Sequence, residues 1–237
     1  MNRILFAKEE ISGDVATFGG ARAEHVLKVL HGEVGQILKT GELDGPIGTG
    51  EITAIEGGSI TVRLKHDSEA LVPCADLILA PPRPRVMKRI LPQLAALGVG
   101  RIVLVGAKKV EKDFWGATLL NEEIYRPLLI DGLMQSGTTA VPTISVVRNF
   151  RKWLRDDLDR EYSSMRRIVA HPYGADFASG SSTSADRLLL AVGPEGGWTD
   201  EEVALLEEKG FLRYSLGPRI LRTDTAVVAL LARLTTS

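Results

Sequence analysis

Three glycines in the segment Gly193-Pro-Glu-Gly-Gly stand between an apolar run and the start of a helix. The run Leu188–Val192 has the composition of a buried strand. Thr199 and Glu202 have the spacing of a capping box, which predicts a helix over Asp200–Lys209. Glycine allows positive φ angles and a close approach of backbone to ligand. Because ligands of open parallel sheets bind where strands end, this segment predicts a binding loop.

The charge of this loop favours a neutral or cationic ligand over a phosphate. Glu195, Asp200, Glu201 and Glu202 would repel a phosphate, and Thr199 already caps the helix amides that a phosphate needs. The loop also lacks the lysine of a nucleotide triphosphate loop. A neutral nucleoside or a cationic centre would suit it better, and a purely structural glycine turn is the alternative.

A second segment near the end of the chain has the same organisation. The run Leu212–Leu216 reads as a strand, Gly217-Pro follows it, and Thr223 is a suitable N-cap for a last helix over Asp224–Leu234. Arg219 and Arg222 place two positive charges beside this glycine turn. Two adjacent units of strand, glycine loop and helix predict one shared binding site.

The elements that must position these loops begin at about Asp76. From there, apolar runs of four to six residues alternate with helical patterns, which predicts an α/β fold with a mainly parallel sheet covered on both faces. Pro92 is expected to kink the first of these helices, over Arg85–Leu97, or to begin it afresh. Further strands are expected at 77–80, 101–105, 143–147 and 168–170, and further helices at 119–135 and 150–158.

The first seventy residues are different. Short apolar segments at 3–6, 34–38, 50–55 and 59–64 are separated by turn clusters, with one helical stretch at 23–29. This pattern predicts a small β-barrel, with a boundary to the next domain in the segment 67–76.

The composition narrows the class of protein. Of the 237 residues, 44% are hydrophobic and 25% charged, as in ordinary globular proteins. The start MNRILFAKEE has no apolar signal segment, so a cytoplasmic protein is expected. Cys74 is the single cysteine, and no His, Asp and Glu cluster has metal-ligand spacing, so no metal is expected.

The net charge of −1 hides a local excess of positive charge. Residues 81–113 carry eight Lys or Arg against two acids, a net of +6, whereas residues 1–70 carry seven against eleven, a net of −4. The basic stretch could hold a phosphate backbone or could be a solvated helix face, and charge alone does not decide between them.

The motifs GPEGGWTDEE and SLGPRILRTDTA together resemble the paired signature of the SPOUT methyltransferases, and most closely the RsmE-type family of 16S rRNA uridine-N3 methyltransferases. The resemblance covers nearly the whole chain. MNRILF, the segment from His25 and the Asp44-Gly turn are similar to the family's N-terminal domain, and the segments from Lys112 and from Gly132 resemble its mid-chain motifs.

The resemblance implies a PUA-like β-barrel RNA-binding domain over residues 1–70 and a SPOUT domain over 71–237 with a C-terminal trefoil knot. It also implies S-adenosylmethionine as cofactor, 16S rRNA of the small ribosomal subunit as substrate, and a homodimer. The apolar face of the last helix, with Val227, Leu230 and Leu231, is expected to form the dimer contact.

Site residues follow from the matched motifs. The cofactor is expected to contact His171, Pro172, Gly193, Pro194, Glu195, Gly196, Leu216, Gly217, Ile220, Leu221, Arg222, Thr225 and Ala226. The residues expected to contact RNA are Arg3, Arg22, Arg83, Arg85, Lys88 and Lys112. The chain departs from the family pattern at Asp113, usually Ser, and at Asp224, commonly Glu.

The chemistry implied is methylation of a ring nitrogen. The N3–H proton of uracil must be lost, and a cation near O2 or O4 would stabilise the anion that develops. Arg222 is the candidate for that cation, and Glu195 and Asp224 are alternatives for the proton acceptor.

Three other functions are weighed against this one. A dehydrogenase or Rossmann-type methyltransferase needs a glycine motif between an early strand and a helix, and Gly98-Val-Gly and Gly48-Thr-Gly both lack that context. A non-catalytic ribosome-assembly factor, or a SPOUT enzyme that methylates a ribose 2′-oxygen or a tRNA base, stays open as an alternative.

Overall fold

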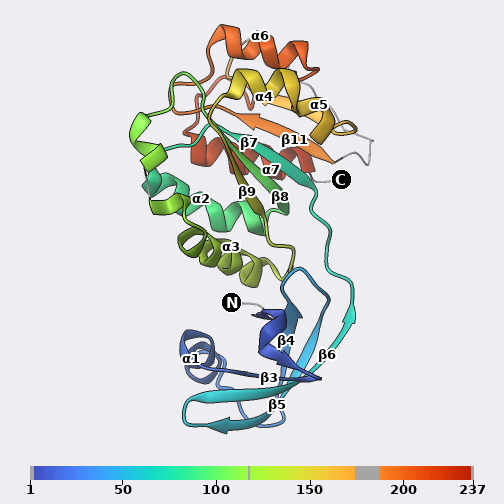
Figure 1. The fold of residues 1–237 in the computed structure, drawn as a ribbon. Helices are drawn as coiled ribbons and strands as arrows, with labels where there is room; N and C mark the ends of the chain where they lie inside the picture. Colours follow the sequence, from blue (N-terminus) through green and yellow to red (C-terminus); the bar gives the residue numbers. More distant parts are fainter. Residues whose placement is uncertain (1–2, 117, 174–186, 236–237) are drawn as a thin grey trace. The chain divides into compact units, whose positions relative to one another are not determined.

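A computed structural model describes residues 3–116, 118–173 and 187–235. The chain divides into two compact units, residues 1–72 with 130–141, and residues 73–129 with 142–237. Figure 1 shows the order of elements along the chain. Within the described residues, no helix is both long and apolar enough to cross a membrane.

The larger unit contains one sheet of six parallel strands in the order β12-β10-β11-β7-β8-β9. The strands are β7 (Ala75–Leu79), β8 (Val99–Val105), β9 (Thr143–Val147), β10 (Arg166–Ala170), β11 (Leu188–Val192) and β12 (Leu212–Tyr214). The predicted α/β class with a mainly parallel sheet is confirmed. Strands β9 and β11 have the predicted bounds, whereas β12 ends two residues earlier than predicted.

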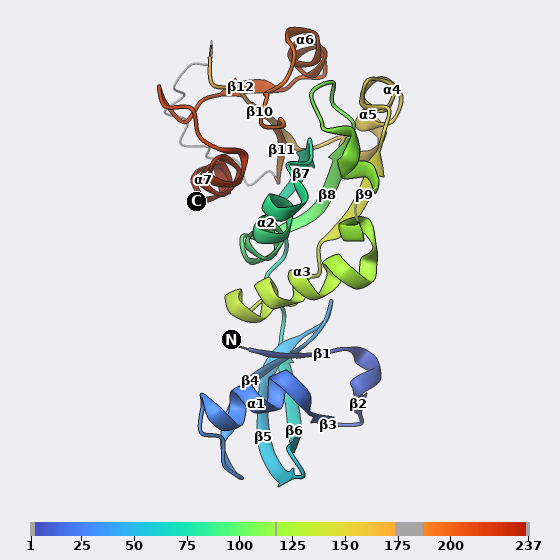
Figure 2. The same cartoon turned by 90° about the vertical axis from the view of Figure 1, so that its left-hand side faces the viewer.

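Helices cover both faces of this sheet, as Figure 2 shows for α2 and α7 on one side and α4 and α5 on the other. Helices α4 (Phe150–Asp156), α5 (Leu158–Glu161) and α6 (Asp200–Glu208) bury their apolar side chains against one face. Helices α2 (Pro84–Ala96) and α7 (Thr223–Thr235) pack against each other, and α7 also packs against β11. Each central strand is therefore apolar on both faces, which explains the continuous apolar runs of its sequence.

The alternative that a helix begins afresh at Pro92 is wrong, because α2 continues through this residue to Ala96, and a kink there stays a prediction. Proline at position 92 removes the amide that would bond to the carbonyl of Lys88. Lys88 lies on the exposed face of α2, where water can satisfy that carbonyl. A break occurs instead in the helix predicted at 150–158, where Asp157 separates α4 from α5.

The smaller unit contains a curled sheet in the order β1-β4-β5-β6-β3-β2, with β1 and β2 as its edges. Its elements are β1 (Ile4–Phe6), β2 (Ile11–Ser12), β3 (Val15–Phe18), α1 (Gly20–Lys28), β4 (Ile37–Glu42), β5 (Ile47–Glu56) and β6 (Ser59–Ser68). Strands β2 and β3 were not predicted, although Gly13-Asp14 between them is a typical hairpin turn. Phe6, Phe18, Val26 and Ile52 lie in the core of this unit.

Helix α3 (Glu122–Ser136) begins in the larger unit, and its last turns belong to the smaller one. The segment after it docks on the Asp44-Gly45 turn. The Asp44 carboxylate accepts from the amide of Val141 at 2.8 Å, the Asp44 amide donates to the carbonyl of Thr139 at 2.9 Å, and the Thr139 hydroxyl donates to the carbonyl of Gly45 at 2.7 Å. Two motifs that carried the resemblance thus bind each other across almost a hundred residues of sequence.

Candidate active site

The loops that follow β10, β11 and β12 lie side by side, because β10 pairs with both of the other strands and all three are parallel. The predicted glycine loops are therefore at one edge of the sheet. The amide of His171, the first residue after β10, donates to the carbonyl of Tyr214 at 3.1 Å, and the hydroxyl of Ser215 donates to the carbonyl of Pro172 at 3.4 Å. These bonds join the His171-Pro172 loop to the loop after β12.

The loop after β11 is a tight turn. The Gly197 amide donates to the carbonyl of Pro194 at 2.8 Å, and Gly197 has a φ of 68°. Gly193 is buried, and a Cβ there would lie 3.0 Å from the amide nitrogen of Trp198, so a larger residue would push the turn open. Trp198 stacks on Phe150 with ring centroids 5.3 Å apart, which fixes the end of the loop to the core.

The predicted capping box at the start of α6 is confirmed. The amide of Thr199 donates to the Glu202 carboxylate at 2.9 Å, and the amide of Glu202 donates to the Thr199 hydroxyl at 3.3 Å. The Glu202 carboxylate also accepts from the amide of Lys108 at 2.8 Å, although only 3% of this residue is exposed. Glu202 therefore fixes the start of α6 to the loop after β8.

Lys109 braces the glycine loop directly. Its ammonium donates to the carbonyls of Gly196 at 2.8 Å and Trp198 at 3.3 Å. Neither carbonyl belongs to a helix or strand, so the lysine satisfies acceptors that the turn leaves unpaired. Sequence reasoning counted Lys109 only as part of a basic stretch, and its position four residues after the end of β8 is the signal that could have identified it.

Glu195 is exposed, and its carboxylate accepts from the amide of Arg83 at 3.2 Å. The guanidinium of Arg83 in turn pairs with Glu111 at 3.0 Å. Helix α2, which begins after Arg83, thus connects the loop after β11 with the loop after β8. The Arg83 guanidinium is thus paired within the fold, and its expected contact with RNA stays a prediction.

The loop after β12 bends at Gly217, whose φ is 118° and whose amide donates to the Ser215 hydroxyl at 3.2 Å. Beyond this bend the side chains turn outward. Leu216 is half-buried, whereas Ile220 and Leu221 are 68% and 38% exposed. An apolar surface therefore accompanies the glycine turn.

Helix α7 begins at the far end of this loop. The Ala226 amide donates to the carbonyl of Arg222, so Thr223, predicted as the N-cap, is already within the first turn. The Asp224 carboxylate pairs with Arg89 of α2 at 2.5 Å. Thr225 is exposed and Ala226 half-buried. Within the described parts of the chain, the exposed guanidinium of Arg222 forms no hydrogen bond or ion pair.

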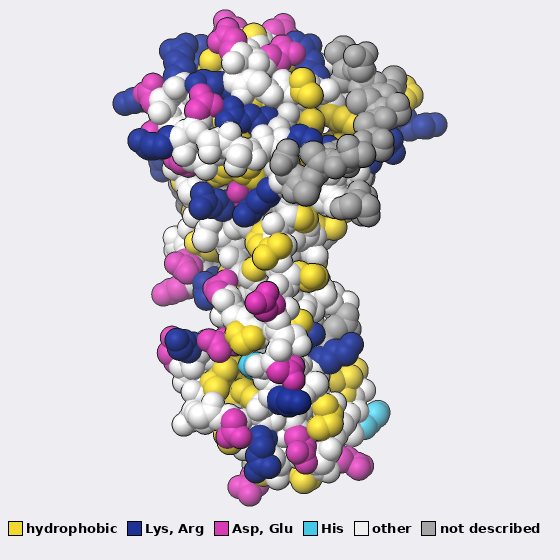
Figure 3. Space-filling view, turned by 90° about the vertical axis from the view of Figure 1, so that its right-hand side faces the viewer, with side chains coloured by type: hydrophobic (Ala, Val, Ile, Leu, Met, Phe, Trp, Pro, Cys, Tyr) yellow, Lys and Arg dark blue, Asp and Glu magenta, His cyan; other side chains and the backbone are white. Residues whose placement is uncertain are grey.

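The residues expected to contact RNA are in different situations. Arg3 donates to the carbonyls of Thr40 and Gly137, and Arg22 pairs with Glu10 and lies over Phe6. Both arginines therefore hold the smaller unit together. On the face of that unit drawn in Figure 3, acidic and basic side chains are interspersed. Arg85 and Lys88 are exposed on the first turns of α2, and the side chains of Lys112 and Asp113 lie outside the described residues.

Among the described residues, no group of three or more His, Cys, Asp and Glu side chains could hold a metal ion. A hollow of about 590 Å³ lies at the ends of β8 and β9, lined by Gly106, Lys108, Arg148, Asn149, Phe150, Arg151, Glu201 and Glu202. This lining contains no residue of the glycine loops 193–197 and 216–222, and none of its residues was predicted to contact the cofactor.

Two comparisons identify the family. The family model described as RNA methyltransferase domain matches residues 72–235. A ribosomal RNA small subunit methyltransferase E from Treponema pallidum is 32% identical over 236 residues, which cover 97% of this chain and 88% of that protein. This chain belongs to the ribosomal RNA small subunit methyltransferase E family. Another protein of that name, from Bacillus subtilis, is 35% identical over 100 residues, 39% of this chain and 38% of its own.

The fold also matches a solved member of the methyltransferase E family. The structure of the Neisseria gonorrhoeae protein, which is bound to S-adenosyl methionine, has a TM-score of 0.77 to this chain at 24% identity and covers 99% of this chain and 96% of its own. At that identity the likeness concerns the fold, and the site of this chain is argued from its own contacts.

We predict that Lys109→Ala weakens cofactor binding by about tenfold, because the carbonyls of Gly196 and Trp198 lose a charged donor whose bond is worth about 1.5–3 kcal/mol. Calorimetry with S-adenosylmethionine measures this change. Lys108→Ala is the matched control, since its side chain is exposed and only its backbone amide holds Glu202. Equal affinities in the two variants would contradict the bracing role.

Proposed function

We propose that this chain transfers a methyl group from S-adenosylmethionine to N3 of a specific uridine in 16S rRNA of the small ribosomal subunit. Membership of the family supports the rRNA methyltransferase activity. The observation that carries the proposal for the site is the junction of two glycine loops, after β11 and β12, at neighbouring strand ends. The place of action that goes with this substrate is the cytoplasm.

The residues of this junction fit the proposed cofactor better than they fit a phosphate-bearing one. The amides at the start of α6 are closed by the reciprocal bonds of Thr199 and Glu202, so they are not offered to an anion. The exposed Glu195 carboxylate favours a cationic centre, and the outward-facing Ile220 and Leu221 offer apolar contact. The loops 193–196 and 216–222 would hold the cofactor, with His171-Pro172 as a third side.

S-adenosylmethionine supplies an electrophilic methyl group on a sulfonium. The N3–methyl bond forms as the sulfur–methyl bond breaks, and the N3 proton passes to a base. Glu195 is the better placed acceptor, because its carboxylate is exposed and bonded to a single backbone amide. Asp224 would first have to leave its pair with Arg89. Arg222, whose guanidinium has no partner among the residues that the structure describes, would stabilise the negative charge on the uracil oxygens.

Finer features of the fold belong to the same proposal. The chain passes from edge strand β12 back to the middle of the sheet, where α7 packs against α2 and β11, and such a return is what a C-terminal trefoil knot requires. We propose that residues 71–237 form a knotted SPOUT domain. The curled sheet of the smaller unit supports a PUA-like RNA-binding domain over residues 1–70.

The function is tested with the purified chain in two experiments. Calorimetry measures cofactor binding, and methylation is measured on small subunits from cells that lack this protein. We expect S-adenosylmethionine to bind in the presence of a chelator, since no group of three or more potential ligand side chains in the described part of the chain could hold a metal ion. We also expect nuclease digestion and mass spectrometry to find one added methyl on uracil N3. Absence of cofactor binding, or a methyl group on a ribose or another base, would contradict the proposal.

A homodimer is also proposed, but through a different face from the one expected. Val227, Leu230 and Leu231 are at most 2% exposed within the single chain, because α7 uses this face against α2 and β11. Leu212 and Ile220 are 67% and 68% exposed and are better candidates for the contact. Light scattering at micromolar concentration is expected to give twice the monomer mass, and a monomer would overturn this.

The role of Arg222 separates catalysis from folding. Arg222→Ala is expected to keep the melting temperature and the cofactor affinity, because the guanidinium has no partner among the described residues, and to lower single-turnover methylation by about 10²–10³-fold. Arg222→Lys should rescue poorly if the contact uses two N–H groups at once. A folded Ala variant with the parental rate would refute the role, and joint loss of stability and cofactor affinity would indicate a structural one.

A further inference from the structure

The positive charges of the larger unit fall into two groups. Most are engaged in ion pairs or hydrogen bonds. At the amino ends of the strands, Arg187 pairs with the buried Asp76, whose pKa is raised by burial, and Arg166 donates to the carbonyl of Leu234. Elsewhere, carboxylates, backbone carbonyls or tyrosine hydroxyls bond to the side chains of Arg83, Arg89, Arg101, Lys109, Arg126, Arg151, Arg160, Arg167, Lys209, Arg213 and Arg233.

The other group is unpaired. Among the described residues of this unit, eight cations form no hydrogen bond or ion pair through their side chains: Arg85, Lys88, Lys108, Arg148, Lys152, Arg155, Arg219 and Arg222. Lys108 and Arg148 lie in the loops that follow β8 and β9, and Arg219 and Arg222 lie in the loop that follows β12. The other four are on α2 and α4, the helices that begin after the ends of β7 and β9. The available positive charge is therefore concentrated along the carboxyl edge of the sheet, which also carries the glycine loops.

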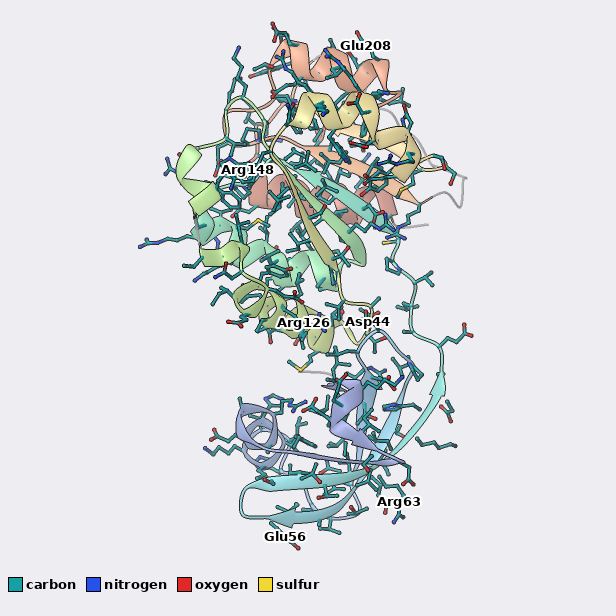
Figure 4. All side chains as sticks on the ribbon, in the orientation of Figure 1. Asp44, Glu56, Arg63, Arg126, Arg148 and Glu208 are labelled. Atoms are coloured by element: carbon teal, nitrogen blue, oxygen red, sulfur yellow. The ribbon has the colours of Figure 1, made fainter. Side chains whose placement is uncertain are left out.

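The hollow at the ends of β8 and β9 is the part of this edge farthest from β12 in the strand order. Gly106 determines its shape. The Gly106 amide donates to the carbonyl of Val147 at 2.9 Å, and a Cβ on Gly106 would lie 2.2 Å from the carbonyl oxygen of Arg148. The two loops thus approach as closely as glycine permits, and Arg148 and Lys108 line one hollow. Figure 4 labels Arg148 where β9 ends.

The acids of the hollow do not cancel these two cations. Glu201 pairs with Arg151, whose hydrogen bond lowers the pKa of that carboxyl and keeps it charged in this pair. Glu202 is buried and bonded to Thr199 and to the amide of Lys108. Lys108 also lowers the pKa of Glu201 through its charge, but among the described residues neither Lys108 nor Arg148 forms an ion pair, and the lining holds three cations against two acids. Arg148 lies with its guanidinium 5.8 Å from the centre of the Trp115 ring.

We propose that this hollow binds phosphates of the RNA substrate through Lys108 and Arg148, so that the RNA runs along the carboxyl edge from the glycine loops to β9. The identity of the RNA rests on the proposed function. An arginine held over a ring offers its N–H fork to phosphate oxygens, and a mobile lysine adds a second positive charge. The side chains of Arg3, Arg22 and Arg83 are bonded within the fold, so the free cations of this edge are better placed to contact the RNA phosphates.

The test compares two double variants that remove the same charge. Lys108→Ala with Arg148→Ala empties the hollow of its free cations, and Lys152→Ala with Arg155→Ala removes two unpaired cations from α4. Binding of unmodified 16S rRNA transcript is measured from 0.05 to 0.3 M salt. The first variant should weaken binding about tenfold or more and lower the slope of log affinity against log salt by roughly 1.5–2, with one counterion released per phosphate contact.

The control variant should bind RNA within about twofold of the parental chain, and all three proteins should keep the same melting temperature and the same affinity for S-adenosylmethionine. Equal RNA affinities of the two double variants would overturn the assignment of the hollow. A parental chain that binds the transcript but methylates no small subunit would instead contradict the proposed function, and the difference between the variants would still decide the hollow.

Discussion

Parallel hydrogen bonding between β12, β10, β11, β7, β8 and β9 sends every strand of the larger unit to the same edge. All six following loops must therefore begin there, whatever their distance in sequence. Gly193 and Ser215 come to one edge because β11 and β12 both pair with β10. The same constraint places Lys108 and Arg148 beside each other, since β8 and β9 are paired up to Val105 and Val147. The site is thus a consequence of strand direction before any side chain contributes.

Within this edge, rigidity comes from polar groups that are fully bonded. Glu202 is almost completely buried, and an unpaired carboxylate there would be costly. Its bonds to Thr199 and to the Lys108 amide instead fix the start of α6 to the loop after β8. Arg89 makes a second connection, from α2 to the first turn of α7. The two glycine loops are held by the same helix α2, through the Arg83 amide at one end and Arg89 nearly two turns further on.

Local signals predicted the parts that depend on local physics. The apolar runs of β9 and β11, the capping box at Thr199 and the alternation of strands with helices all follow from neighbouring residues. The sequence could not show which polar residues form hydrogen bonds or ion pairs with residues far away along the chain. Arg3 bonds to Gly137, 134 positions away, and Asp44 to Val141, 97 positions away. For that reason the sequence did not show that Arg3 and Arg22 bond within the smaller unit, and their RNA contacts stay a prediction. Nor did it show that the apolar face of α7 packs within the chain's own fold.

Adjacent cations at the carboxyl edge divide between holding the site and facing solvent. Lys109 satisfies two carbonyls of the glycine loop, whereas the side chain of Lys108, one position earlier, has no such acceptor among the described residues. Arg83 pairs with Glu111, whereas Arg85, two positions later, is exposed and has no ion pair with any described residue. Backbone geometry explains the alternation, since consecutive side chains of a loop or of a first helical turn point in different directions. A cation that faces the fold is bonded, and its neighbour then faces outward.

A basic stretch at a strand end therefore stabilises the loop on one side and presents unpaired charge on the other. A solvated helix face would show no such selection by position, and the paired Arg187 and Arg166 at the opposite edge indicate that free charge is not a general property of this surface.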